Sequence, residues 1–206
     1  MRLKSLTLIV AAMMAVGSTS TLTSCKQEST PAATEAEPAA QAEEQSQDPE
    51  AAIKKAIGDY MVNEFGKQYT QGQYCIPNLI LLETNDAENE TLVWGGFWVF
   101  NYNQVGDTLK TVSGGNHPGL MHLRRTGTGY EVTKFDAVGD GSNFEPTARK
   151  IFGERYDSFM NNESNDGMRE SLRGIAIARY VKEHKLPVTM YQDFGWDPVA
   201  IPTVEE

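Results

Sequence analysis

Cysteine and histidine are scarce in this chain, whose 206 residues include two cysteines and three histidines. Neither residue type occurs in the C-x-x-C or H-x-x-x-H spacing, so the sequence offers no transition-metal motif. The nucleophile motif G-x-S-x-G and the glycine loop that cradles phosphates are also missing. We therefore expect no metal and no cofactor.

Positive charge is scarce as well. The chain has 18 lysines and arginines against 28 aspartates and glutamates, which gives a net charge of −10. Proteins bind nucleic acids and anionic lipid surfaces through basic patches. We therefore expect no nucleic-acid partner.

The amino-terminal residues resemble the signal of a bacterial lipoprotein. Arg2 and Lys4 precede an apolar run, Leu6–Val16, that is too short to span a bilayer. The run leads to Leu22–Cys25, which resembles the lipobox at which such proteins are cleaved and acylated. The resemblance implies a signal peptide of residues 1–24, lipidation of Cys25, and a membrane-anchored lipoprotein facing the periplasm or the cell exterior. An ordinary secretory signal that happens to contain a cysteine is the alternative.

The segment that follows Cys25 has the composition of a disordered tether. Residues 26–50 include one lysine and seven acids, with no aromatic and no large aliphatic side chain. Such a segment cannot bury enough apolar surface to offset the entropy lost on ordering. We predict an acidic tether over residues 25–48 and a single α+β domain over residues 49–206.

A helix is predicted at about residues 50–69. Asp48 supplies an N-cap side chain, Pro49 suits the first turn, and Glu50 faces the positive end of the helix. Apolar residues then recur at helical spacing, which gives the helix one face to bury: Ile53, Ile57, Tyr60, Met61, Phe65 and Tyr69.

The following residues, about 74–138, read as strands separated by glycine-bearing turns, the pattern of an antiparallel meander. Within the run from Thr91 both faces are apolar, with Leu92, Trp94, Trp98, Phe100 and Tyr102 on one and Val93, Phe97 and Val99 on the other. Gly95-Gly96 indicates a bend in this strand. We expect Trp94, Trp98, Phe100 and Tyr102 to pack against Ile53, Ile57, Met61 and Phe65 as core. An open pocket lined by those aromatic residues is the alternative.

Helices are predicted again after Val138, at residues 144–153, 155–160 and 168–184. The last has a wide apolar arc, which is typical of a helix buried on more than one side. The tail from Val188 to Trp196 is apolar enough to pack back as a strand or extended arm. Together the patterns predict an α+β fold in which a long N-terminal helix packs on a bent antiparallel sheet, with additional C-terminal helices.

Few residues stand out as chemical candidates. His122 and Asp136, on a predicted sheet face, are the best acid–base candidates, and His122 is also a candidate for lining the pocket. Asp136–Gly141 begins like a calcium loop, but Val138 occupies a ligand position and the glutamate at the twelfth position is missing. Cys75 adjoins an apolar run, so we expect a buried thiol.

The order of elements resembles the NTF2-like and cystatin-like α+β domains. Gly114-Gly115, His117-Pro118-Gly119, Tyr130-Glu131-Val132, Asp140-Gly141-Ser142 and Ile151-Phe152 look like a domain of exported bacterial proteins of unassigned function. The resemblance covers about residues 90–160 and implies no catalytic residues.

We expect binding rather than catalysis, because the candidate residues equally fit structural roles. One hypothesis is an interaction domain that presents its sheet edge or loops to another envelope protein. The other is a small-molecule pocket of NTF2-like type, with or without catalysis, between the helix and the sheet.

Overall fold

The computed structural model describes residues 48–205 except residue 88. The predicted signal peptide, the Cys25 anchor and nearly all of the predicted tether lie outside these residues. Their assignment therefore stays a prediction.

The first helix begins where the sequence predicts. Helix α1 (Pro49–Tyr60) is capped by Asp48, whose carboxylate accepts a hydrogen bond from the Glu50 amide at 3.1 Å. The prediction of one long helix to residue 69 is wrong, because the α-helix ends after 12 residues. The chain continues as a π-helical turn, η1 (Met61–Phe65), and a 3-10 turn, η2 (Gly66–Gln68). The wider π turn keeps Met61 in the core and places Phe65 over His117, with ring centroids 4.2 Å apart.

Four long strands form an antiparallel meander: β1 (Tyr74–Asp86), β2 (Thr91–Val105), β3 (Thr108–Thr126) and β4 (Gly129–Ala137). Two short strands, β5 (Met190–Gln192) and β6 (Val199–Ala200), extend the sheet in the order β1-β2-β3-β5-β6, and β4 pairs with the other end of β3. Strand β5 runs parallel to β3, so the sheet is mixed and the purely antiparallel prediction is wrong. The tail reaches β3 only after a helical crossover, which permits parallel pairing.

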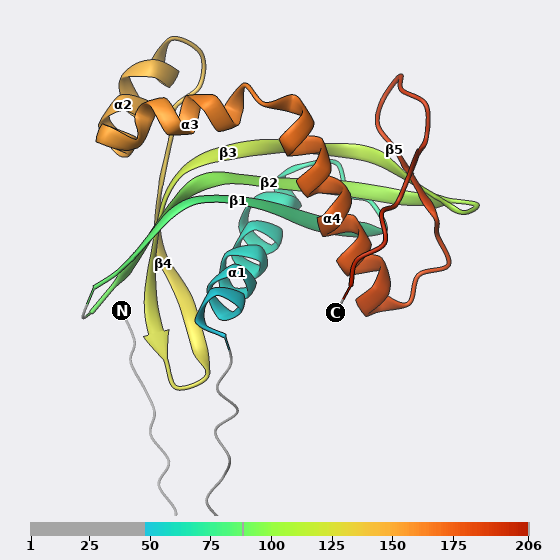
Figure 1. Cartoon of the computed structure of the whole chain (residues 1–206), viewed down its shortest axis with the longest axis horizontal. Coiled ribbons are helices and arrows are strands. Elements are labelled where there is room, and N and C mark those ends of the chain that lie inside the picture. Colours follow the sequence, from blue (N-terminus) through green and yellow to red (C-terminus); the bar gives the residue numbers. More distant parts are fainter. Residues whose placement is uncertain (1–47, 88, 206) are drawn as a thin grey trace, which may run out of the picture. The chain divides into compact units, whose positions relative to one another are not determined.

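The sheet is bent (Figure 1), and the pairing of β1 with β2 is irregular near Gly95. The register shifts by one residue at Leu81/Glu83 of β1, a bulge that lies opposite Gly95 and Trp94 of β2. A Cβ on Gly95 would lie 2.5 Å from the Ile80 carbonyl oxygen. Glycine at this position therefore permits the close approach of the two backbones.

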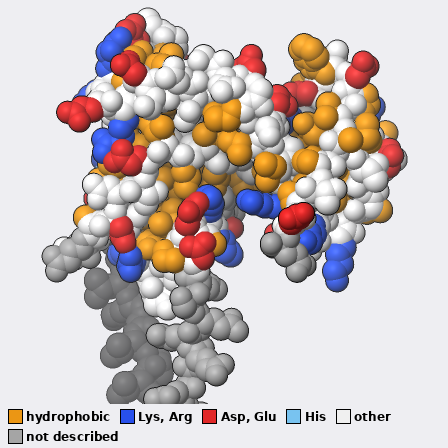
Figure 2. All heavy atoms as spheres, viewed as in Figure 1, with side chains coloured by type: hydrophobic (Ala, Val, Ile, Leu, Met, Phe, Trp, Pro, Cys, Tyr) orange, Lys and Arg blue, Asp and Glu red, His pale blue; other side chains and the backbone are white. Residues whose placement is uncertain are grey.

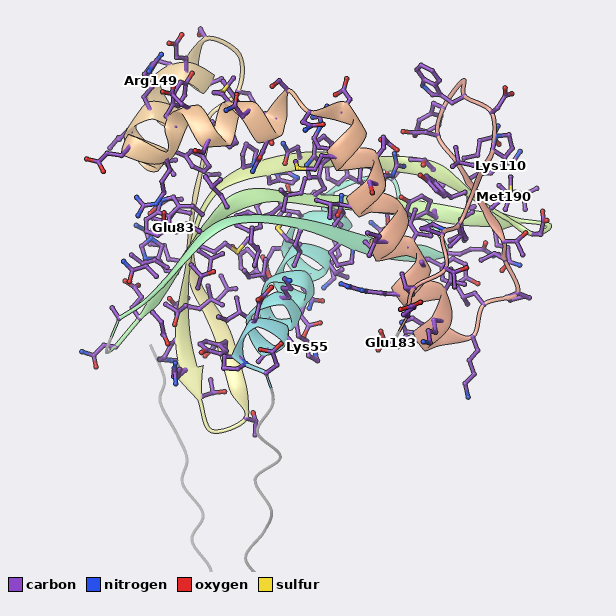
Figure 3. The ribbon with its side chains drawn as sticks, in the orientation of Figure 1. Lys55, Glu83, Lys110, Arg149, Glu183 and Met190 are labelled. Atoms are coloured by element: carbon purple, nitrogen blue, oxygen red, sulfur yellow. The ribbon has the colours of Figure 1, made fainter. Side chains whose placement is uncertain are left out.

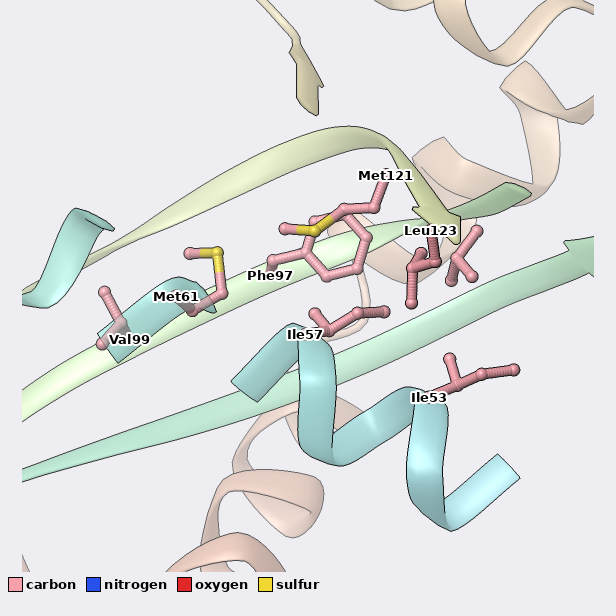
Figure 4. Close-up of a cluster of buried hydrophobic side chains, with 8 residues drawn as sticks. Ile53, Ile57, Met61, Phe97, Val99, Met121 and Leu123 are labelled. Atoms are coloured by element: carbon pink, nitrogen blue, oxygen red, sulfur yellow. The ribbon is translucent and has the colours of Figure 1, made fainter. Parts of the chain in front are cut away.

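Helix α1 covers the face of β2 that carries Val93, Phe97 and Val99 (Figure 4). Ile53, Ile57 and Met61 fill this core, with 5% exposure or less, together with Met121 and Leu123 of β3. The prediction that α1 packs on the tryptophan face is therefore wrong, although the division of β2 into two faces is correct. A buried indole needs a hydrogen-bond acceptor, and Trp94 finds one in α2, where its Nε1 donates to the Ile151 carbonyl at 3.0 Å.

The tryptophan face is covered by the C-terminal helices, α2 (Phe144–Phe152), α3 (Tyr156–Glu163) and α4 (Asp166–His184). Short 3-10 turns, η3 (Gly141–Asn143) and η4 (Gly153–Arg155), flank α2. Trp94 packs with Phe152 and Phe159, whereas Tyr102 packs with Ile177 of α4 and Tyr191 of β5. Lys110 of β3 and Met190 of β5 mark the place where the tail joins the sheet (Figure 3). The predicted packing of the tail is therefore confirmed for Val188–Gln192 and wrong for Phe194 and Trp196, which are 65% and 74% exposed.

Within residues 48–205, apart from residue 88, no helix is long and apolar enough to cross a membrane.

Candidate functional site

A cavity of about 690 Å³ lies on the tryptophan face of the sheet, bounded by β1, β2, α4 and the C-terminal segment. We call it the α4 cavity. The residues that line it are Asn78, Trp98, Phe100, Asp166, Arg169, Glu170, Arg173, Tyr191, Asp193, Trp196, Asp197 and Val199. Its volume falls within the range of about 300–1,000 Å³ that small-molecule sites occupy.

One wall of the α4 cavity is aromatic. Trp98 and Phe100 are two residues apart on β2, so both point to the same face of the sheet. Their rings stack with centroids 5.6 Å apart and an interplanar angle of 13°. Arg169 and Arg173, one turn apart on α4, lie over these rings at 5.4 and 4.0 Å from the centroids. The wall is thus a pair of stacked rings held by two guanidinium groups through cation–π contacts.

Arg173 ties α4 to three other segments. It is 3% exposed, and it donates from Nε to the Tyr102 hydroxyl at 3.0 Å, from Nη1 to Asp193 at 2.8 Å and from Nη2 to the Thr111 hydroxyl at 2.7 Å. Burial raises the pKa of Tyr102 to about 12, so this hydroxyl remains neutral as it accepts the bond. Burial alone would raise the pKa of Asp193, but the hydrogen bond and charge of Arg173 outweigh it and lower that pKa. Asp193 therefore stays ionised, and the buried cation is paired.

The mouth of the α4 cavity carries exposed apolar side chains. Trp196 is 74% exposed and Val199 is 51% exposed, and both line the cavity. Phe194, 65% exposed, belongs to the same segment but does not line it. Figure 2 shows hydrophobic side chains gathered over this C-terminal segment, on the right of the view.

Beside the aromatic wall, three polar side chains converge over Gly96. A Cβ on Gly96 would lie 3.1 Å from Glu163 Oε1, 3.4 Å from Asn116 Oδ1 and 3.7 Å from Trp98 Nε1. Asn116 donates to Glu163 Oε2 at 2.8 Å, but within the described residues Trp98 Nε1 and Asn116 Oδ1 are buried without a hydrogen-bond partner. Burial raises the pKa of the Glu163 carboxyl, because removal from water disfavours its charged form.

The candidate residues from the sequence fall in four places. Trp98 and Phe100 line the α4 cavity, whereas Tyr102 lies beneath it and holds Arg173. Trp94 is buried in the cluster with Phe152, outside the cavity lining. His122 also lies outside the lining, at the other end of β3.

The two acid–base candidates, His122 and Asp136, are hydrogen-bonded to each other. His122 Nε2 lies 2.9 Å from Asp136 Oδ2, and its Nδ1 lies 2.9 Å from Glu90 Oε1. Hydrogen bonds from Lys134 and His122 lower the pKa of Asp136. Because both ring nitrogens of His122 already have carboxylate partners, the group fits a bridge between strands better than a proton-transfer site.

The sequence did not predict the half of the site that α4 and the tail contribute. Arg169 and Arg173 stand four residues apart on a helix with a wide apolar arc, and this spacing was the available signal for a helix face with a buried charge. Asp193 and Trp196 gave no signal beyond an apolar tail. In the part of the chain that the structure describes, no group of three or more His, Cys, Asp or Glu side chains is placed to hold a metal ion.

Comparison of the chain with protein-family models, with curated proteins and with solved structures finds no match.

Proposed function

We propose that this protein binds a small organic molecule in the α4 cavity. The observation that carries the proposal is the position of Trp98 and Phe100. These large aromatic side chains are only partly buried and face about 690 Å³ of space, although the same strand buries Val93, Phe97 and Val99 completely. Aromatic walls with a few fixed polar groups are the usual lining of a small-molecule site.

The polar groups of the cavity suit recognition better than catalysis. Arg173 and Asp193 pair with each other, and Arg173 also bonds Tyr102 and Thr111, so these groups hold the shape of the site. A pre-formed site of this kind loses little entropy when a ligand binds. The proposal is therefore binding without a chemical step.

We propose a membrane-anchored location for the same protein, with Cys25 as the acylated residue. The support is the sequence alone, in the lipobox-like Leu22–Cys25 and the acidic segment after it. A binding domain held on a tether of this length could reach ligands about 25–30 Å from the membrane surface.

We also propose that the fold is a distant variant of the NTF2-like and cystatin-like arrangement. A helix that precedes the strands and packs on a bent sheet supports the relationship. The short α1 and the position of the α4 cavity on the opposite face from α1 differ from the expectation. The pocket expected between the first helix and the sheet is therefore proposed between α4 and the sheet instead.

An interaction surface is the second candidate function, favoured by the exposed Phe194, Trp196 and Val199. Exposed apolar groups of this size mark protein contacts as well as pocket mouths. A ligand that stabilises the isolated protein would favour the pocket.

The test is a library of small fragments screened by chemical unfolding. A ligand at 100 times its dissociation constant should stabilise the protein by about 2.7 kcal/mol. Replacement of Trp98 by alanine should remove this stabilisation, whereas Phe194→Ala, in the same segment as Trp196 but outside the cavity lining, should preserve it. Ligands that stabilise the wild type and Trp98→Ala equally, or a diverse library without any stabilising compound, would contradict the proposal.

A further inference from the structure

We propose that the α4 cavity selects a small organic cation with an apolar body, such as an aryl or alkyl ammonium ion. The inference rests on the proposed binding function and adds the charge of the ligand. It follows from the charges that line the cavity, from how the two arginines are paired, and from the exposed indole at the mouth.

The lining carries a net negative charge. Four of its side chains are carboxylates, Asp166, Glu170, Asp193 and Asp197, against the two guanidinium groups of Arg169 and Arg173, which leaves −2. Arg169 pairs with Asp166, and Arg173 pairs with Asp193 at 2.8 Å. Glu170 lies 3.7 Å from the already paired Arg173, and Asp197 has no ion-pair or hydrogen-bond partner within residues 48–205 apart from residue 88. The charge left for a ligand is therefore acidic.

Two features of the cavity favour an anion instead. One is Arg169 Nε, a buried donor without a hydrogen-bond partner in the described residues, although the charge of Arg169 is paired with Asp166. The other is the N-terminus of α4. A helix N-terminus is equivalent to about half a positive charge, and its effect falls off within the first turn. Asp166 in that first turn and the Asn165 cap, whose side chain accepts from the Met168 amide at 3.0 Å, already occupy it. Half a charge is smaller than the net −2 of the lining, so the acidic side chains decide the sign.

An anionic ligand would also have to compete with existing pairs. Arg173 is 3% exposed and makes three hydrogen bonds, so an anion could reach it only by displacing Asp193. The anion would then stand beside Arg173 in place of Asp193, and its repulsion from the displaced Asp193 carboxylate would offset the gain. A cation meets no such competition at Asp197.

The aromatic groups provide the rest of the recognition. The rings of Trp98 and Phe100 already accept the guanidinium groups of Arg169 and Arg173 against their faces. Trp196, beside Asp197 at the mouth, presents an indole that is 74% exposed. Indole faces attract ammonium ions, and a neighbouring carboxylate adds to this attraction. An apolar body attached to the cation would occupy the space along Trp98 and Phe100.

The experiment uses three probes of similar size: phenyltrimethylammonium, its neutral analogue 2-phenylpropan-2-ol, and benzenesulfonate. The affinities of the three probes are measured by titration calorimetry or NMR. The sample is the full mature chain, which contains residues 48–206. The cation should bind about tenfold more tightly than the neutral alcohol, and benzenesulfonate most weakly. Raising the salt concentration from about 50 to 500 mM should weaken the binding of the cation alone, because the carboxylates at the mouth are exposed and salt screens their charge.

Two exposed positions test the assignment without a risk to folding. Asp197→Asn and Trp196→Ala should each lower the affinity for the cation about threefold to tenfold. Asp197→Asn should leave the affinity for the neutral alcohol unchanged. Asp157→Asn on α3 and Phe194→Ala are the matched controls, since both residues are exposed and outside the cavity lining. These controls should leave all three affinities unchanged.

The outcomes separate this inference from the proposed function. If the alcohol or the sulfonate bound as tightly as the cation or more tightly, the cation inference would be overturned. The binding function would still stand if that binding were lost in Trp98→Ala. An unchanged cation affinity in Asp197→Asn would overturn it as well. If none of the three probes binds, the cation inference fails, and the fragment library decides the binding function separately.

Discussion

Arg173 determines much of the site at the scale of single residues. Its guanidinium group joins α4 to Tyr102 of β2, Thr111 of β3 and Asp193 of the tail, so one side chain fixes three segments around the cavity. The planar fork of arginine carries three separate nitrogens, each of which donates to a different partner here, whereas lysine has one nitrogen that cannot reach all three positions.

Replacing Arg173 by lysine should therefore destabilise the protein by about 1–3 kcal/mol. The buried hydroxyls of Tyr102 and Thr111 would lose their donor, and the ion pair with Asp193 would lose its geometry. Denaturant unfolding measures the change. Arg179→Lys, an exposed position on the same helix, is the control and should change stability by less than about 0.5 kcal/mol. Equal effects of the two substitutions would contradict the account of Arg173.

Glu163 gives a pH-dependent prediction. Burial raises its pKa in the folded protein, so the folded state keeps the proton to a higher pH than the unfolded state. Its contribution to stability is thus complete below the unfolded value and is lost as the pH rises through the folded value. Glutamine stays neutral, so Glu163→Gln should gain stability relative to wild type as the pH rises above the ordinary pKa of a glutamate.

Parallel urea unfolding of both proteins at several pH values measures this difference. Glu154→Gln, an exposed position in η4, serves as the control and should show little change with pH. If Glu163→Gln lost stability relative to wild type as the pH rose, the carboxylate form would be the one that the fold prefers.

At the scale of elements, the sequence predicted local features well and contacts between elements poorly. The Asp48-Pro49 helix start, the meander and the two faces of β2 depend on neighbouring residues and were correct. The choice of which helix covers which face was wrong, because both faces of β2 are apolar and periodicity cannot rank them. The parallel pairing of β5 depends on a tail more than 60 residues from β3, and no local pattern encodes it.

Trp94 and Trp98 make the difference between core and cavity measurable within one strand. Both point to the same face of β2, but Trp94 is 7% exposed among phenylalanines, and Trp98 borders the cavity. We expect Trp94→Ala to cost about 3–5 kcal/mol and Trp98→Ala about 1–2 kcal/mol in unfolding free energy. If Trp98→Ala cost as much unfolding free energy as Trp94→Ala or more, the face of β2 at Trp98 would be a filled core.

At the scale of the whole molecule, the α4 cavity joins segments that are far apart in the chain. Its walls come from β1 and β2, before residue 106, and from residues 166–199. The sequence pointed to Trp98 and Phe100 as pocket candidates, but the opposing wall depends on a chain path that only the folded structure defines.

The anchor is the prediction that concerns the chain as a whole. Cys25→Ser should move the protein from the membrane fraction to the soluble fraction without changing its unfolding transition, since Cys25 precedes the described domain. Fractionation and mass spectrometry of the mature N-terminus measure this. A wild-type protein that is soluble and carries no acyl group would contradict the lipoprotein assignment.

The central claim, a ligand site beside Trp98, is tested most directly by the indole NMR signals of the three tryptophans during titration with a cation or library ligand. Trp98 and Trp196 line the α4 cavity, whereas Trp94 donates to the Ile151 carbonyl in a separate cluster and serves as an internal control. The account predicts saturable shifts of the Trp98 and Trp196 signals while the Trp94 signal stays in place. Ligands that shift Trp94 and leave Trp98 unchanged would contradict it.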